Sequence, residues 1–168
     1  MKSRLLLVGV LVAVSLTTYA GTVLATPSSG FAGITLAKAT FGNLRSHVES
    51  QTPQFWNEVI HTEGDSDLYV QQNTWQPGGS TGWHTHPGPS FVTVTQGSVT
   101  VYEGDDPSCT PHVYTAGTPN NSFVDVGGGD VHLIRNETGA VAQTIAVQFT
   151  PAGATRRIDA DKPGNCSF

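Results

Sequence analysis

The sequence predicts an all-β fold of the barrel or sandwich type. Glycine and proline interrupt short runs of β-branched and aromatic residues about every ten residues, a pattern typical of this class. Helical periodicity is weak throughout, and only residues 53–60 fit one or two helical turns. We find no internal repeat and no low-complexity tract. We therefore expect a single domain built from strands.

The expected strands are the segments in which apolar and polar residues alternate between turn-forming residues. In an extended chain, such alternation directs one set of side chains to a core and the other to solvent. These segments are residues 34–41, 67–76, 82–86, 90–96, 98–103, 112–116, 122–126, 131–136 and 140–149.

The N-terminal segment has the features of a secretory signal peptide. Lys2 and Arg4 precede an apolar run over residues 5–16, and small residues follow as far as Ala25. We expect cleavage after Ala25, with Ala20 as the alternative. The run is shorter than the roughly 20 apolar residues that span a bilayer. We therefore expect a secreted or extracytoplasmic protein that is not attached to the membrane once the signal is cleaved.

The chain after residue 25 divides into an N-terminal extension (26–66), a barrel (67–151) and a C-terminal tail (152–168). These 143 residues carry 6 basic and 13 acidic side chains, a net charge of −7. Because they contain no basic stripe, nucleic acid and anionic lipid surfaces are poor candidates as partners.

Cys109 and Cys166 are the only cysteines of the chain. An even number of cysteines in an exported protein favours a disulfide. Cys109 lies in a turn-like stretch rich in Asp and Pro, whereas Cys166 lies in the tail. We expect a disulfide that ties the tail to a hairpin loop, and two free thiols are the alternative.

Three histidines form the candidate metal site. In an extended strand the side chains at positions i and i+2 share a face, so His84 and His86 point the same way. In an extended segment 131–136, His132 shares a face with Asn136. If a barrel places these two faces opposite each other, three neutral imidazoles can hold one divalent first-row metal ion.

The spacing of these residues resembles the two motifs of the cupin superfamily. The first motif is a glycine, five residues, His-x-His, three or four residues, Glu, six residues and a glycine. The second motif ends in Gly, two residues, His, three residues and Asn. The residues that match are Gly78, His84, His86 and Gly97 in the first motif, and Gly129, His132 and Asn136 in the second.

The sequence also departs from these motifs. Ser90 occupies the place of the first motif's Glu, and Asn121 and Gly127 stand where the second motif has its first glycine and its proline. The resemblance implies a double-stranded β-helix, the cupin jelly-roll barrel, as a single domain with an N-terminal strand extension. It also implies a three-histidine centre, because a serine hydroxyl is a poor ligand for a divalent ion.

Glu103 is a candidate replacement for the missing carboxylate. If Gln96 and Gly97 form a two-residue hairpin turn, Ser90 faces Glu103 across the two strands. Glu103 would then complete the metal shell or accept a hydrogen bond from an imidazole N–H. The alternative is that Glu103 ends its strand in solvent.

Other residues are expected to have structural roles. Trp83 points to the opposite face of its strand from His84, so we expect it to pack against outer strands or a partner subunit. A homodimer is therefore possible. We expect Asn136 to fix a loop through hydrogen bonds. Outside the site we place His47, His61 and His112.

The resemblance implies metal-dependent chemistry on a small-molecule substrate, with dioxygenase-like oxidation as the leading reaction. A metal-dependent isomerase and a non-catalytic extracellular metal- or ligand-binding protein are the alternatives. The metal would be Fe, Mn, Ni, Cu or Zn, since all accept imidazole. Because the ligand histidines must be neutral, we expect metal affinity to fall below about pH 6.5.

Overall fold

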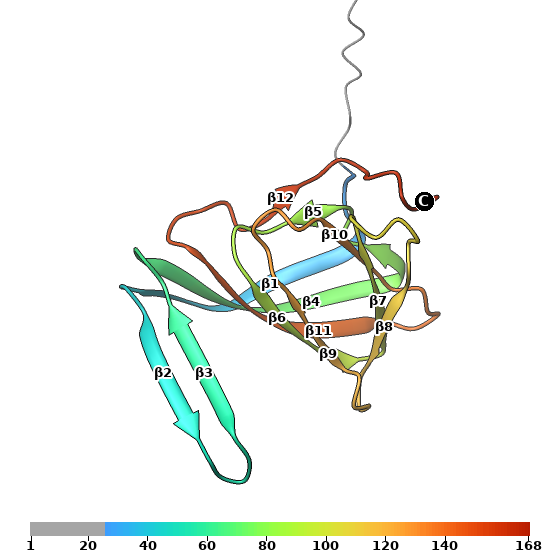
Figure 1. Ribbon diagram of the computed structural model, residues 1–168. Helices are drawn as coiled ribbons and strands as arrows, with labels where there is room; N and C mark the ends of the chain where they lie inside the picture. The colour runs from blue at the N-terminus through green and yellow to red at the C-terminus, as the bar shows by residue number, and fades with distance from the viewer. Residues whose placement is uncertain (1–25) are drawn as a thin grey trace, which may run out of the picture.

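The computed structural model describes residues 26–168, which form twelve strands and no helix (Figure 1). The predicted signal peptide and its cleavage site lie outside the described residues. Across the described part of the chain, no helix has the length and apolar character needed to cross a membrane. The strands are β1 (Ser29–Phe41), β2 (Arg45–Ser50), β3 (Trp56–His61), β4 (Ser66–Ser80), β5 (His84–Thr85), β6 (Ser90–Gln96), β7 (Ser98–Glu103), β8 (His112–Thr115), β9 (Ser122–Asp125), β10 (His132–Arg135), β11 (Ala142–Pro151) and β12 (Ile158–Asp159).

Ten of these strands form one antiparallel sheet that curves into a nearly closed barrel (Figure 1). Its order is β12-β5-β10-β4-β11-β6-β9, with β1 alongside β4, and with β7 between β10 and β8. The N-terminal strand β1 pairs with β4 along almost its whole length, from Ser29 opposite Ser80 to Phe41 opposite Ser66. The predicted all-β fold, a jelly-roll barrel with an N-terminal strand extension, is confirmed.

Each of the nine predicted strands has a counterpart, but the helix expected over residues 53–60 is wrong. Trp56–His61 is strand β3, which forms a hairpin with β2 from Arg45 opposite His61 to Ser50 opposite Trp56. The β-branched and aromatic residues of this segment favour an extended chain, and its pairing with β2 decides the outcome. The hairpin projects away from the barrel (Figure 1).

The predicted hairpin between β6 and β7 is also wrong. Strand β6 pairs with β11 and β9, whereas β7 pairs with β10 and β8. Gly97 is therefore a corner at which the chain passes from one part of the barrel to the other. Its φ of +65° and a backbone oxygen 2.7 Å from where a Cβ would lie both require glycine there.

The core has two parts, one inside the barrel and one outside it. Inside, Trp75 packs with apolar side chains from β6, β7, β10 and β11. Outside, Trp83 is fully buried with Tyr102, Leu133 and Cys166. The outward orientation predicted for Trp83 is confirmed, and the layer that covers it includes the chain's own C-terminal tail.

The Cys109–Cys166 disulfide is present. Cys109 lies in the loop that joins the hairpin strands β7 and β8, and Cys166 lies in the tail. The tail also places Phe168 against Tyr102, with ring centroids 4.9 Å apart. The predicted connection between the tail and a hairpin loop is confirmed.

Candidate metal centre

The structure brings His84, His86 and His132 together inside the barrel. His84 and His132 are directly paired across β5 and β10, and His86 follows β5 on the same face. The ring centroids are 4.9 Å apart for His84 and His86, 4.4 Å for His84 and His132, and 5.4 Å for His86 and His132. One potential ligand nitrogen from each ring lies within 4.8 Å of the other two.

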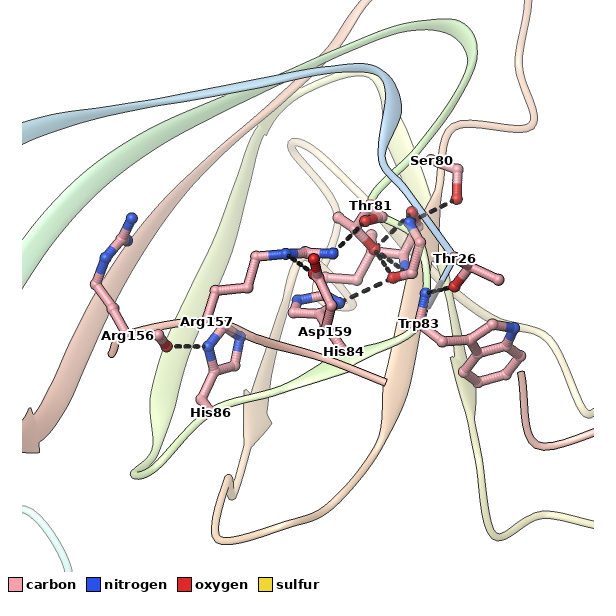
Figure 2. Close-up of polar contacts among 11 residues, drawn as sticks. Thr26, Ser80, Thr81, Trp83, His84, His86, Arg156, Arg157 and Asp159 are labelled. Atoms are coloured by element: carbon pink, nitrogen blue, oxygen red, sulfur yellow. Dashed lines mark hydrogen bonds and ion pairs between the residues drawn. The ribbon is translucent and has the colours of Figure 1, made fainter. Parts of the chain in front are cut away.

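Backbone carbonyls fix the orientation of two of the rings (Figure 2). His84 Nδ1 lies 2.9 Å from the carbonyl oxygen of Gly82, and His86 Nδ1 lies 2.8 Å from that of Arg156. A carbonyl oxygen only accepts hydrogen bonds, so each Nδ1 carries the proton and donates it. The Nε2 lone pairs of His84 and His86 are therefore free to bind a metal ion, as is common for metal-binding histidines.

Burial keeps the three imidazoles neutral. It is the main cause that lowers the pKa of His84, His86 and His132 below the ordinary value. At His84 the nearby His132 and Arg157 lower the pKa further. Neutral imidazole is the form that binds metal ions.

The histidines border a cavity of about 160 Å³. That volume corresponds to about five water molecules at liquid density, which sets the scale for a small ligand. The cavity lining combines apolar side chains with polar and charged ones. Besides the histidines, its lining includes Phe31, Trp75, Val92, Phe123, Ile134, Ala146, Gln71, Asn73, Thr81, Ser90, Asp125, Thr144, Gln148, Arg156 and Arg157.

Asp125 is the member of the site that sequence reasoning missed. Its carboxylate is buried, with Oδ2 3.4 Å from His86 Nε2 and Oδ1 3.7 Å from His132 Nδ1. One feature of the sequence could have indicated it: Asp125 is two residues after Phe123 and therefore shares the inward face of its strand. An acidic residue on the inward face of a strand is unusual.

Ser90 lies in the cavity wall as predicted, but its neighbours differ from those expected. Ser90 is opposite Asp125 on β9 and Gln148 on β11. Its hydroxyl oxygen accepts a hydrogen bond from Gln148 Nε2 at 3.0 Å.

Glu103 does not face Ser90, so the pairing proposed for it is wrong. Because β7 pairs with β10, Glu103 is opposite His132. Burial, followed by the charges of Asp130 and Asp125, raises the pKa of Glu103 to about 7. Like Asp125, Glu103 does not belong to the group of ligand atoms that lie within 4.8 Å of one another, which the three histidines form. A role for it beside His132 stays a prediction.

The donor set fits a divalent transition-metal ion. Three neutral imidazoles with buried, converging nitrogens are the ligands that Fe, Mn, Ni, Cu and Zn all accept. The remaining histidines lie outside this group. His47 and His61 are in the β2–β3 hairpin, and His112 is exposed on β8. The fold and the site define a jelly-roll barrel protein with a candidate metal centre in its interior.

Comparison with known proteins relates this chain to solved structures of cupins. No family model matches the chain, and no curated protein does. A cupin superfamily protein from Desulfitobacterium hafniense is 10% identical, with a TM-score of 0.42 over 66% of this chain and 81% of that chain. A polyketide cyclase from Streptomyces resistomycificus is 16% identical, with a TM-score of 0.45 over 57% of this chain and 64% of that one.

An oxalate oxidase in complex with the substrate analogue glycolate is 22% identical, with a TM-score of 0.41. That match covers 48% of this chain and 41% of the oxalate oxidase, so it spans less than half of the enzyme. The similarity to these three structures concerns the fold alone.

Proposed function

We propose that this protein is a secreted metal-binding protein that acts on a small molecule at His84, His86 and His132, with oxygen-dependent oxidation as the leading reaction. The observation that carries the proposal is the convergence of the three buried imidazoles on one cavity. The disulfide supports secretion, because such bonds persist in oxidising compartments.

The residues of the chain have distinct tasks in this proposal. A metal ion bound here would supply Lewis acidity, and a redox-active one would also supply electrons for oxygen chemistry. The three histidines would hold it, and the carbonyls of Gly82 and Arg156 would keep two of the rings in place. The apolar side chains of the cavity lining would help to exclude water from the ligand.

Two arginines at the cavity favour an anionic substrate. Arg157 donates hydrogen bonds to the Thr81 carbonyl and to Asp159, both at 2.7 Å, and lies close to His84 (Figure 2). Within residues 26–168, no carboxylate lies within 4.0 Å of the Arg156 guanidinium, which lies over the ring of Tyr69. Arginine is well suited to bind carboxylates, so we propose a small carboxylic acid as the substrate class.

The test begins with elemental analysis of the purified full chain, followed by oxygen uptake with a panel of small acids, alcohols and aldehydes. We expect bound transition metal, and turnover of an acid that His84→Ala, His86→Ala and His132→Ala abolish. His112→Ala is the matched control, since this histidine is exposed on β8, and it should behave as wild type. Arg156→Met should raise KM for the acid more than it lowers kcat.

The same assays distinguish the alternative functions. Turnover that continues without oxygen would indicate a metal-dependent isomerase. Ligand binding without turnover would indicate a non-catalytic extracellular binding protein. A chain that binds no transition metal at neutral pH would contradict both metal-dependent reactions and leave only a protein that binds a ligand without a metal.

A further inference from the structure

We infer that Asp125 is the fourth protein ligand of the metal ion, so that the centre is formed by three histidines and one aspartate. This inference rests on the proposed function, because it assumes that the histidines bind a metal. It concerns the carboxylate that the first motif would place at position 90, where this chain has Ser90.

The position of Asp125 makes it the natural substitute for that carboxylate. Asp125 ends strand β9 directly opposite Ser90 on β6. Residues opposite each other on antiparallel strands have Cβ atoms about 4.5–5.5 Å apart and share a face of the sheet. A carboxylate at 125 therefore enters the cavity beside the place that a residue-90 side chain would use.

The two oxygens of Asp125 have different surroundings. Oδ1 accepts a hydrogen bond from the backbone N–H of Gly127 at 2.9 Å. Oδ2 is buried and has no hydrogen-bond partner among the described residues. The contact of Oδ2 is with His86 Nε2, at 3.4 Å. Oδ1 is thus anchored, and Oδ2 is left facing the metal-binding nitrogen of a histidine.

This contact lacks the positive charge that would make it favourable. His86 donates its Nδ1 proton to the Arg156 carbonyl, so in the neutral ring Nε2 presents a lone pair. Two lone pairs then face each other in a buried site, where an unpaired carboxylate is costly. A metal ion between them removes this repulsion. Two ligands about 2.1 Å from a tetrahedral ion lie about 3.4 Å apart, which is the separation of Oδ2 from His86 Nε2. Asp125 is not among the ligand atoms that lie within 4.8 Å of one another, so its side chain would shift toward the other two rings when the ion binds.

Gly127 links this arrangement to a second departure from the cupin motif. It stands where the second motif has proline, and proline has no N–H to donate to Asp125. Its φ is +67°, and the Gly88 carbonyl oxygen would lie 2.4 Å from an added Cβ, so the turn admits only glycine. One change therefore explains both departures from the motifs. The carboxylate lies at position 125 in place of position 90, and the backbone N–H of residue 127, which a proline would lack, orients it.

The experiment compares metal binding by wild type, Asp125→Asn and the control Glu63→Gln, with Co²⁺ as the probe and a competing chelator to measure affinity. We expect Asp125→Asn to weaken Co²⁺ binding by at least about tenfold, since losing even an outer partner of a ligand costs that much. Its visible Co²⁺ spectrum should also change, because that spectrum reports the number and type of ligands. Glu63→Gln alters an exposed carboxylate outside the site and should keep the wild-type affinity and spectrum.

A rescue variant guards against an indirect effect on folding. In Ser90→Glu/Asp125→Asn the carboxylate returns to the opposite strand, and we expect recovery of affinity and of a carboxylate-type Co²⁺ spectrum. Circular dichroism would check that each variant is folded, and Asp125→Glu, which keeps the carboxylate, would replace Asp125→Asn if that variant does not fold. Weaker binding with an unchanged spectrum would overturn the ligand role, as would wild-type behaviour of Asp125→Asn. Wild type that binds no Co²⁺ would instead reject the proposed function itself.

Discussion

Ser90 and Gln148 form a buried hydrogen bond across strands β6 and β11, with Gln148 Nε2 3.0 Å from the Ser90 hydroxyl oxygen. The bond lies in the wall of the cavity that the histidines border. The hydroxyl at the position of the motif's glutamate is thus engaged with a neighbouring amide. This relationship separates the structural role of Ser90 from the metal-binding role that its position in the motif would suggest.

Ser90→Ala should therefore leave metal affinity within about twofold of wild type. It should cost about 1–3 kcal/mol of unfolding free energy, because the Gln148 amide would lose its buried acceptor. Chelator competition measures the affinity, and urea denaturation measures the stability. A large loss of affinity at unchanged stability would show that the hydroxyl binds the metal directly.

Metal affinity should persist to lower pH than the ordinary histidine pKa suggests. The sequence predicts a fall below about pH 6.5, but burial lowers the pKa of all three histidines. Protons then compete with the metal only at more acidic pH, so the fall in affinity should begin below pH 6.5. Chelator competition at several pH values, corrected for protonation of the chelator, would check this. A steep fall that begins at about pH 6.5 would mean that the imidazoles are solvated.

The features that the sequence predicts well are those that depend on local spacing. The parity of neighbouring residues places His84 and His86 on one face and Trp83 on the other, and both placements hold in the structure. The same reasoning locates the nine predicted strands. The extended backbone alone decides to which face each side chain points, so this prediction does not require knowing which strands are neighbours.

The errors come from pairings between distant segments. Strands β6 and β7 are adjacent in sequence, yet each pairs with other strands, so Ser90 meets Asp125 where Glu103 was expected. The β2–β3 hairpin was missed for another reason. Nearly all of its residues are exposed on both faces, so they lack the apolar alternation that reveals a half-buried strand.

Asn136→Ala should destabilise the protein by about 2–4 kcal/mol, because a fully buried amide would leave several backbone groups without partners. Asn136 Nδ2 donates to the Ala140 carbonyl at 2.7 Å, and Oδ1 accepts from the backbone N–H and hydroxyl of Thr138 at 3.0 and 2.7 Å. Asn73→Ala is the control, since its amide makes a single hydrogen bond, to Thr144. Equal losses for the two variants in urea denaturation would contradict this account of the loop.

Glu103→Gln should stabilise the metal-free protein, and more so at pH 8 than at pH 5. The pKa of Glu103 is raised from 4.5 to about 7, mainly by burial and then by Asp130. Between those two values the folded protein binds more protons than the unfolded chain. The contribution of Glu103 to stability is therefore present below about pH 4.5 and is lost as the pH rises to about 7.

Glutamine resembles the protonated side chain at every pH, so the variant avoids this loss. The difference in unfolding free energy between variant and wild type should be small at pH 5 and largest above pH 7. Urea denaturation of chelator-treated protein at both pH values gives that difference, in which the titration of the histidines largely cancels. Asp130→Asn removes the largest charge effect on Glu103, so it should bring the pKa of Glu103 in the folded protein closer to 4.5. The pH range over which Glu103 changes the stability should then become narrower. A difference that is the same at pH 5 and pH 8 would show that Glu103 is solvated in the folded protein, as strand-end carboxylates usually are.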